Sequence, residues 1–322
     1  MKKNIIYLLL IIFSTFLNAN EKVVLQLKWF HQFQFAGYYA AKEKGFYDEV
    51  GLDVEIKQRD LKYNNIDEVI NGNAQYGVAD SILILYRLKQ QPVVIVSPIF
   101  QHSPSVFISL KKKNISSIYE LNNKDILFYP NNTDGFSLLA MIKKFNLDVN
   151  LVRERYKDDY MRLIKNEVDV IPAYIANEPF LFKEKGYDVN IINPTNYGFD
   201  MYGDMLFTNE DEAKNNPIRV EKFKEATLKG WKYALENKEE IIQLINEKYS
   251  KEKSIEHLRY EANAIDSLIN KDVTPLGYLD QGRIRYISEM YKYYGLTEST
   301  IDLKDFLFDE ISKKDKKLSL SD

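Results

Sequence analysis

The sequence predicts an α/β protein made of two lobes with a ligand cleft between them. Strand-like and helix-like segments alternate from Val23 onward in two successive blocks, and the chain after Leu206 is mainly helical. Its 322 residues exceed what one hydrophobic core usually holds. We therefore expect one lobe to contain residues 20–106 with 206–322 and the other to contain residues 107–205. The cleft should lie beyond the carboxyl ends of the strands.

The first block opens with a predicted strand at Val23–Trp29 and a predicted helix at Ala36–Lys44. Gly45 is expected to end that helix, because glycine adopts the left-handed conformation of a C-terminal cap without steric cost. Leu52–Lys57 alternates apolar and charged side chains with period two, which indicates a half-buried strand.

The remainder of the first block is predicted from capping residues and an apolar run. Asp80 and Ser81 are suitable N-cap residues for a helix at Ile82–Leu88. Val93–Val96 is an unbroken β-branched and apolar run, typical of a parallel strand buried on both faces. Two further elements are expected between Lys57 and Asp80, a helix at Ile66–Ile70 and a strand at Tyr76–Ala79.

The second block repeats the alternation with three strands and two helices. The strands are expected at Ile126–Tyr129, Val168–Ile171 and Val189–Ile192, and the helices at Phe136–Phe145 and Asn177–Lys185. The polar residues that separate the elements of this block differ from those of the first block, so it is not an internal repeat of the first one. It is expected to form the second lobe.

The C-terminal part is predicted to be helical. Asn216 is expected to cap a helix in which Pro217 takes the first position, where its missing N–H costs no hydrogen bond. Further helices are expected at Glu239–Tyr249, Ser254–Ile269 and Asp280–Tyr294. The polar tail Ser312–Asp322 is expected to fray.

Composition excludes several classes of function. The formal net charge of −3 gives no basic surface for nucleic acid. The sequence has no cysteine, which excludes disulfides, thiolate metal sites and catalytic thiols. Its three histidines are His31, His102 and His257, and they form no metalloprotease motif. These observations favour binding over catalysis, with no cofactor and no metal.

Met1–Ala19 has the pattern of a secretory signal peptide. Lys2 and Lys3 precede the apolar run Ile5–Leu17, and Ala19 provides a small residue for cleavage. The run is shorter than the roughly 20 residues of a comfortable membrane span. We expect cleavage after Ala19 and a location in the periplasm of a Gram-negative bacterium. An uncleaved N-terminal anchor is the alternative.

The segment Leu25–Tyr39 is the strongest candidate for a binding site. It combines six aromatic residues with side-chain amides and a histidine where a strand is expected to lead into a helix. A binding site in which a flat heterocycle stacks on an aromatic ring and forms hydrogen bonds with side-chain amides explains this pattern. The alternative is that the aromatic residues belong to the core. The binding residues predicted here are Trp29, Gln34, Phe35 and Tyr38.

Other candidate binding residues follow predicted strands or lie where the chain is expected to cross between lobes. Simpler roles compete with binding: Asp80, Ser81 and Asn177 are helix caps, His102 is structural, and Asp204 belongs to a turn. A carboxylate at Glu178 would suit a ligand with an amine or a protonated ring. The complete second set is Asp80, Ser81, His102, Asn132, Asp134, Tyr174, Asn177, Glu178, Tyr202 and Asp204.

Several segments together resemble bacterial periplasmic binding proteins related to thiamine pyrimidine synthase, a branch of the type II solute-binding fold. They are Trp29, Gln34–Ala41 with Gly45–Tyr47, Phe100–Pro104, Asn177–Pro179 and Tyr202–Asp204. The resemblance covers nearly all of the chain after residue 19. It implies capture of a thiamine pyrimidine precursor by a monomer that serves an ABC importer.

The resemblance does not extend to the chemistry of the synthase. Ala79 and Leu83 stand at the positions that match its cofactor-binding lysine and its substrate histidine. A synthase that makes the pyrimidine phosphate from histidine and pyridoxal phosphate is therefore disfavoured. The same module resembles the outer sensor of membrane histidine kinases and cyclases, so a membrane sensor is the alternative to an ABC permease as partner.

Overall fold

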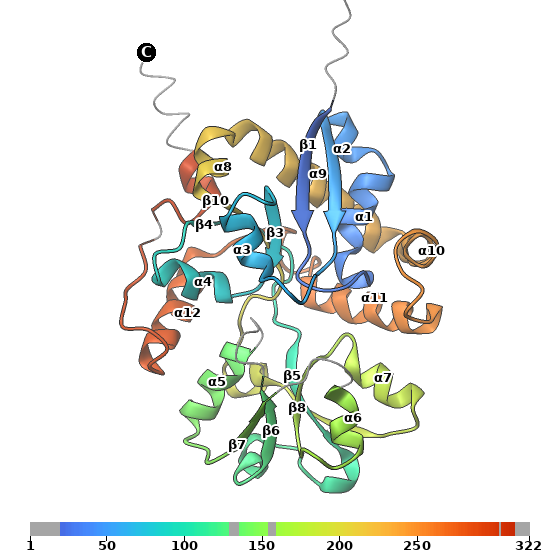
Figure 1. Cartoon of the computed structure of the whole chain (residues 1–322), viewed down its shortest axis with the longest axis vertical. Helices are drawn as coiled ribbons and strands as arrows, with labels where there is room; N and C mark the ends of the chain where they lie inside the picture. Colours follow the sequence, from blue (N-terminus) through green and yellow to red (C-terminus); the bar gives the residue numbers. More distant parts are fainter. Residues whose placement is uncertain (1–19, 129–134, 154–158, 303, 313–322) are drawn as a thin grey trace, which may run out of the picture.

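The computed structural model describes residues 20–128, 135–153, 159–302 and 304–312. The predicted signal peptide at residues 1–19 and the candidate binding residues Asn132 and Asp134 lie outside these ranges. The described chain forms two lobes, one above the other in Figure 1. Within the described ranges, no helix is both long and apolar enough to cross a membrane.

Lobe one is built on a five-stranded sheet with the order β2-β1-β3-β10-β4. The strands β1, β2 and β3 run parallel, whereas β10 runs antiparallel to β3 and β4. The bounds are β1 (Glu21–Gln26), β2 (Leu52–Lys57), β3 (Tyr76–Ala79), β4 (Val93–Pro98) and β10 (Met205–Asn209). The chain thus leaves this sheet after β4 and returns to its interior with β10.

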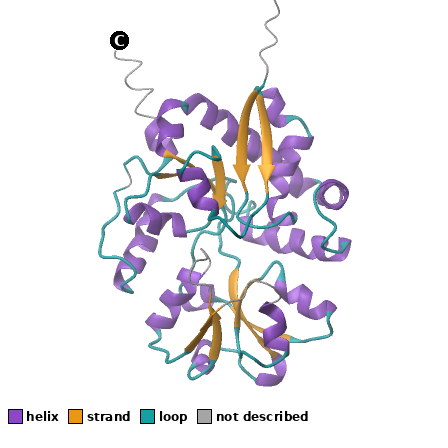
Figure 2. Cartoon of the chain, in the orientation of Figure 1, coloured by secondary structure: helices purple, strands orange, loops and turns teal. Residues whose placement is uncertain are grey.

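Helices cover both faces of the lobe-one sheet (Figure 2), and two clusters of buried apolar side chains fill the layers. One face carries α1 (Ala36–Glu43), α2 (Phe46–Glu49), α9 (Pro217–Glu236), α10 (Lys238–Lys248) and α11 (Ile255–Ile269). The other helices are α3 (Asn65–Ile70), α4 (Ile82–Leu88), α8 (Glu210–Asn215) and α12 (Gln281–Tyr293). Packing between these layers holds in place the loops that follow the strands.

Two glycines allow α1 and α9 to approach each other closely. A Cβ atom on Gly230 would lie 2.2 Å from the carbonyl oxygen of Gly37, and one on Gly37 would lie 2.1 Å from the Trp231 ring. Trp231 is fully buried at this crossing. The close contact therefore requires glycine at both positions.

Lobe two contains a three-stranded antiparallel sheet and a parallel pair of strands. The sheet has the order β8-β5-β9, with β5 (Ser105–Leu110) between β8 (Ile171–Tyr174) and β9 (Val189–Ile192). The pair is β6 (Asp125–Phe128) with β7 (Asn150–Arg153). The helices are α5 (Gly135–Lys144), α6 (Asp159–Ile164) and α7 (Glu178–Glu184).

Three expectations from the sequence need correction. The strand β4 is buried on both faces as expected, but it pairs with β10 in antiparallel rather than parallel fashion. The strand expected at Val168–Ile171 lies at Ile171–Tyr174, where the ladder to β5 forms. The strand β5 was not expected, because Ser103 and Pro104 before it are typical of a loop. Its central place in lobe two depends on partners distant in the sequence.

Candidate functional site

A buried lysine joins the two lobes at the junction between them. Lys28 lies just beyond β1, and its side chain is only 4% exposed. Its Nζ lies 3.0 Å from Asp80 Oδ2 and 3.4 Å from Asp204 Oδ1. It also donates a hydrogen bond of 2.5 Å to the Tyr174 hydroxyl, which comes from the end of β8 in lobe two. The ammonium group therefore holds groups of both lobes together.

Neighbouring strands explain why these groups meet. Because β1 and β3 are parallel neighbours, the residues that follow them emerge at the same edge of the sheet. Asp80 follows β3 directly, and its Oδ1 accepts the Ile82 N–H at 2.9 Å, so it also caps α4. Asp204 immediately precedes β10, and its carbonyl oxygen accepts the N–H groups of Ile99 and Phe100 from the other crossing segment.

Two glutamine side chains extend the polar contacts along the junction of the lobes. Gln34 Nε2 donates to Asp204 Oδ2 at 2.7 Å, and Gln32 Nε2 donates to Gln34 Oε1 at 2.5 Å. Both amides are buried. Because buried amides need partners on both ends, this chain of hydrogen bonds fixes the orientation of each one. The chain continues to Lys253, which donates to Gln32 Oε1.

A second lysine forms a similar bridge between the lobes. Lys253 precedes α11, pairs with Glu261 of that helix and donates to Asn177 Oδ1 of lobe two at 2.7 Å. The other oxygen of Glu261 accepts the Phe33 N–H at 2.9 Å. On the side of lobe two, Glu178 accepts the Tyr174 N–H at 2.7 Å and the Asn177 amide at 2.6 Å.

Burial perturbs the ionisable groups of this second cluster. Desolvation raises the pKa of Glu261 and of Glu178, and the nearby ammonium of Lys253 offsets only part of that rise. Burial, followed by the positive charge of Lys253, lowers the pKa of His257 to about 4. His257 is therefore neutral at physiological pH. Perturbed groups gathered between two lobes are typical of a functional site.

Aromatic packing closes the lobes on the α7 and α11 side. The Phe180 ring lies 4.9 Å from the His257 ring and 5.2 Å from the Tyr260 ring, measured between centroids. The Tyr260 hydroxyl donates to the Ile175 carbonyl at 2.9 Å. These contacts join lobe two directly to lobe one.

Six of the residues predicted from the sequence come together in these contacts. They lie at the end of β8, at the start of α7, in the short 3-10 helix that precedes α1, directly after β3 and directly before β10. Their roles in ligand binding stay predictions. The six are Gln34, Asp80, Tyr174, Asn177, Glu178 and Asp204.

The predicted aromatic residues occupy different environments. Phe35 and Tyr38 are fully buried in the lobe-one core, at 0% and 1% exposure. Trp29 is half-buried and packs edge-on against the exposed ring of Phe30, with 5.3 Å between centroids. Of the aromatic residues predicted in this segment, Trp29 is therefore the best placed to meet a ligand.

Two other predicted residues, Tyr202 and His102, lie on the crossing segments, and a third, Ser81, lies between β3 and α4. Ser81 Oγ donates to the Tyr202 carbonyl at 2.6 Å. The Tyr202 hydroxyl accepts the N–H of Asp280, and its ring faces the Arg283 guanidinium at 4.2 Å. His102 Nδ1 lies 2.8 Å from Asp200 Oδ1. These contacts connect the crossing segments to the start of α12.

Four residues of the site were not predicted: Lys28, Gln32, Lys253 and Glu261. Glu261 carried a usable signal, because it lies on the same stripe of α11 as the buried Leu258 and Ile265. Lys28 carried a weaker one, as a charge at the end of the apolar strand. Lys253 lies in a polar connection, where nothing in the sequence distinguishes it from a solvated lysine.

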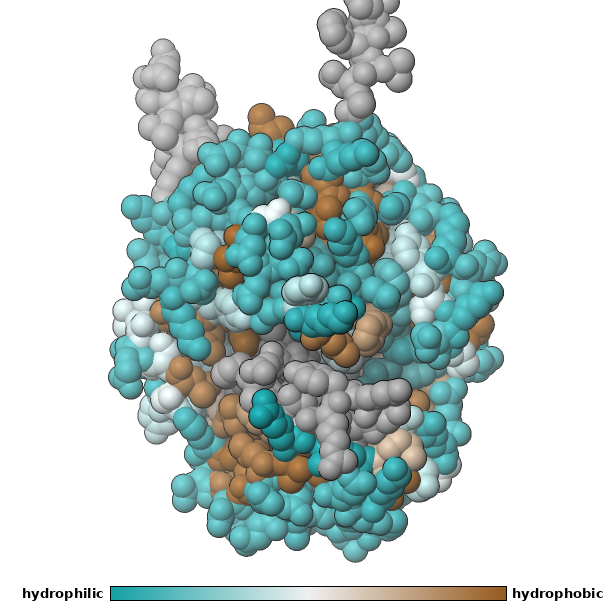
Figure 3. Space-filling model, in the orientation of Figure 1, coloured by the Kyte–Doolittle hydropathy of each residue, from teal (hydrophilic) through white to brown (hydrophobic). Residues whose placement is uncertain are grey.

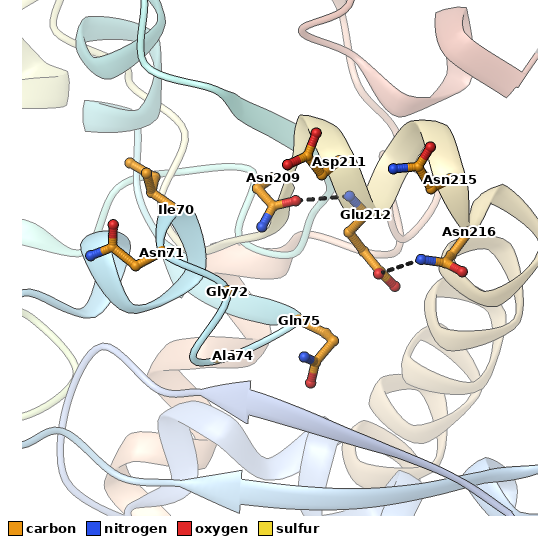
Figure 4. Close-up of a pocket in the computed structure, with 10 residues that line it drawn as sticks. All are labelled: Ile70, Asn71, Gly72, Ala74, Gln75, Asn209, Asp211, Glu212, Asn215 and Asn216. Atoms are coloured by element: carbon orange, nitrogen blue, oxygen red, sulfur yellow. Dashed lines mark hydrogen bonds between the residues drawn. The ribbon is translucent and has the colours of Figure 1, made fainter.

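Two surface hollows lie at the opposite edge of the lobe-one sheet. One has a volume of about 250 Å³ and is lined by the ends of α3 and α8, with Gln75 and Glu212 among its side chains (Figure 4). The other, of about 480 Å³, is lined by Glu21, Arg219 and neighbouring residues. Neither contains a predicted binding residue. Within the described part of the chain, no group of three or more His, Asp or Glu side chains could hold a metal ion.

Stability is expected to fall between about pH 6.5 and pH 4 because of His257. Its folded pKa of about 4 lies below the ordinary value of 6.5, so the unfolded chain binds its proton first as the pH decreases. Below pH 4 this group should cause no further loss. The variant His257→Phe keeps a ring against Phe180 and should show a shallower decrease of melting temperature over that range. Equal slopes in both proteins would contradict the assignment.

Comparisons with known proteins are consistent with this two-lobed architecture. Residues 32–241 match the family described as NMT1/THI5 like. The chain is 26% identical over 236 residues to a riboflavin-binding protein from Chloroflexus aurantiacus, covering 70% of this chain and 65% of that protein, just under two thirds of its length. It is 24% identical over 233 residues to a formylaminopyrimidine-binding protein from Halalkalibacterium halodurans, covering 70% of each.

Solved structures give the same fold. A putative periplasmic sulfonate-binding protein from Methylobacillus flagellatus matches with a TM-score of 0.66 and 19% identity, over 93% of this chain and 96% of that one. The aliphatic sulphonate binding protein of Escherichia coli matches with a TM-score of 0.67 and 12% identity, over 90% and 98%. The neighbours share the periplasmic binding protein fold. Because the family match covers more than half of the sequence, the chain belongs to the NMT1/THI5-like family.

Proposed function

We propose that this protein is an extracytoplasmic solute-binding protein that encloses a small planar heterocycle between its lobes and delivers it to an ABC permease. The observation that carries the proposal is the contact of Lys28 with Tyr174 across the junction. Polar side chains of both lobes converge there, and the half-buried Trp29 follows Lys28 directly in the sequence. A flat ring with exocyclic amines could stack on the indole and donate to the carboxylates and amide oxygens.

The named relatives support this ligand class. One is named for riboflavin and the other for a formylaminopyrimidine, both of which contain a pyrimidine ring. The hydrogen bond from Lys253 to Asn177 would hold the two lobes closed over such a ring. Delivery to a permease, rather than to a membrane sensor, is the role that the periplasmic ABC neighbours favour.

Binding rather than pyrimidine synthesis is the activity we propose. Ala79, at the position matching the cofactor-binding lysine of the synthase, is fully buried in β3 and has no amine. Leu83 is also fully buried, in α4, and has no imidazole. The purified protein incubated with pyridoxal phosphate should form no internal aldimine that borohydride can reduce. A stoichiometric reduced adduct confined to one buried lysine, found by peptide mass spectrometry, would contradict this expectation.

Identification of the bound molecule tests the function directly. The protein is purified from its native host, denatured, and the released small molecules are analysed by mass spectrometry. A flavin or a pyrimidine bearing an amine is the expected result, confirmed by calorimetric titration of the pure compound into ligand-free protein. Release of a sulfonate, a peptide or a sugar would refute the proposed ligand class.

The variant Trp29→Ala should weaken binding of that compound by roughly 5- to 150-fold, because stacking of a base-like ring on an aromatic side chain contributes about 1 to 3 kcal/mol. The melting temperature should change little, since Trp29 is only half-buried. Tyr293→Ala serves as the control, because its ring is 83% exposed on α12. A large loss of stability with unchanged affinity would show that Trp29 is a core residue.

A further inference from the structure

Helix α7 of lobe two and helix α11 of lobe one face each other across the junction of the lobes (Figure 1). The contacts between them come from one face of each helix, because the contacting residues are three or four positions apart. Phe180 and Glu184 contribute from α7, and Ser254, His257 and Tyr260 contribute from α11. We call these five residues the α7–α11 contact.

The polar part of the α7–α11 contact lies at the first turn of α11. Ser254 Oγ accepts the His257 N–H at 3.1 Å, which caps the helix, and it donates its own proton to Glu184 Oε1 at 2.9 Å. The other carboxylate oxygen of Glu184 lies 3.6 Å from His257 Nδ1. A negative charge at a helix N-terminus is stabilised by the helix dipole. The start of α11 therefore offers a favourable position to a carboxylate of lobe two.

The aromatic part of the contact consists of three rings that come from both lobes. Phe180 packs against the rings of His257 and Tyr260, and His257 is only 3% exposed. The Tyr260 hydroxyl donates to the Ile175 carbonyl of lobe two at 2.9 Å. Separation of the lobes would expose these rings to water and break the hydrogen bonds, so the contact stabilises the joined arrangement.

The segments that cross between the lobes are held near the other end of α11. The His102 N–H donates to the carbonyl oxygen of Leu268 at 3.1 Å, and Gln101 Nε2 donates to that of Tyr278 at 2.9 Å. An α-helix rises about 1.5 Å per residue, so Ser254 lies about 20 Å from Leu268 along α11. Because displacement grows with distance from the axis of a rotation, a rotation of lobe two about the crossing segments would pull the α7–α11 contact apart.

We propose that the α7–α11 contact is a latch, which must break whenever lobe two rotates away from lobe one and whose strength sets the ratio of separated to joined molecules. An interaction that is made in only one of two conformations shifts the equilibrium toward that conformation. The three rings, the Ser254 hydroxyl and the Glu184 carboxylate meet only when the lobes are joined. The latch goes beyond the proposed function, because it acts in the protein itself and does not depend on which molecule binds.

Distances between spin labels in the two lobes test the latch. The sequence has no cysteine, so two cysteines introduced at exposed positions can be labelled specifically. One pair, Lys183→Cys with Glu247→Cys, spans the lobes, and a control pair, Glu225→Cys with Glu247→Cys, lies within lobe one. Pulsed electron paramagnetic resonance of ligand-free protein gives the share of molecules in which the lobes are further apart. The distance in the control pair should stay the same in every variant.

The variant Phe180→Ala should raise the ratio of separated to joined molecules roughly 2- to 10-fold, the effect expected from loss of an aromatic contact. Glu184→Ala should shift the ratio in the same direction, and its side chain is exposed enough to be removed without harm to the fold. Tyr119→Ala is the matched control, because its ring is 69% exposed on lobe two and lies outside the contact. Melting curves verify folding.

A folded Phe180→Ala protein with unchanged distances between the lobes overturns the latch. If that variant does not fold, Glu184→Ala decides in the same way. The measurement needs no ligand, so the latch can fail while the proposed function stands, and the proposed function can fail while the latch stands.

Discussion

Replacement of Lys28 by methionine is expected to lower the free energy of unfolding by about 3 to 5 kcal/mol, the cost of breaking a buried ion pair by removal of one partner. The variant keeps the length of the side chain but leaves Asp80 and Asp204 without their shared ammonium group. Urea denaturation followed by circular dichroism measures the change. The bridge to Tyr174 is lost as well, so ligand affinity should also decrease.

The matched control for this experiment is Lys57→Met. Lys57 lies on the adjacent strand β2, is 46% exposed, and has its carboxylate partner Glu55 at 3.9 Å. Exposed pairs of this kind contribute about 0 to 1 kcal/mol. The double variant Lys28→Met/Asp204→Asn should recover part of the loss, because it also removes the charge of one of the two carboxylates that contact Lys28. If Lys28→Met proves as stable as the wild type, the ion pairs do not support the fold.

The second large effect is expected from Gly230→Ala, which should destabilise lobe one by up to about 3 kcal/mol. The new methyl group would lie 2.2 Å from the Gly37 carbonyl oxygen and 2.6 Å from the Ala41 Cβ, so α1 and α9 must separate. Overpacking of a core costs about 1 to 3 kcal/mol and sometimes more. Alanine gains about 1 kcal/mol in helix propensity over glycine, which is too little to offset that cost.

Lys232→Ala on the same helix is the control, because Lys232 is exposed and its loss should change stability by no more than about 0.5 kcal/mol. Thermal unfolding of both variants compares the effects. A Gly230→Ala protein with unchanged stability would mean that the two helices can move apart at no cost. The crossing would then place no constraint on the segment after β1.

Much of the fold could be predicted because its elements carry local signals. The strands Leu52–Lys57 and Val189–Ile192 and the helix Ile82–Leu88 form with the predicted bounds. Periodicity and capping are properties of adjacent residues, so the sequence displays them directly. The pairing of β10 with β4 depends on contacts between distant segments, and for that reason the direction of β4 was predicted wrongly.

The site was predictable to the extent that polar residues follow strands. Asp80 was identified by that position and Asp204 by its place where the chain was expected to cross between lobes, and the structure brings both to Lys28. The lysine itself was missed, because lysine is rarely buried unless it is paired and the pairing exists only in the folded protein. Glu261 could have been found, since it interrupts the apolar face of α11.

The interior position of β10 determines when the larger lobe can form during synthesis. The sheet of lobe one lacks the strand between β3 and β4 until residues 205–209 have left the ribosome. All strands of lobe two lie between residues 105 and 192, so that lobe can fold earlier on the nascent chain. The core of lobe one further requires α9 against α1, a contact between segments far apart in the sequence. The part of the molecule that contains the first strand to be synthesised is therefore the last to fold.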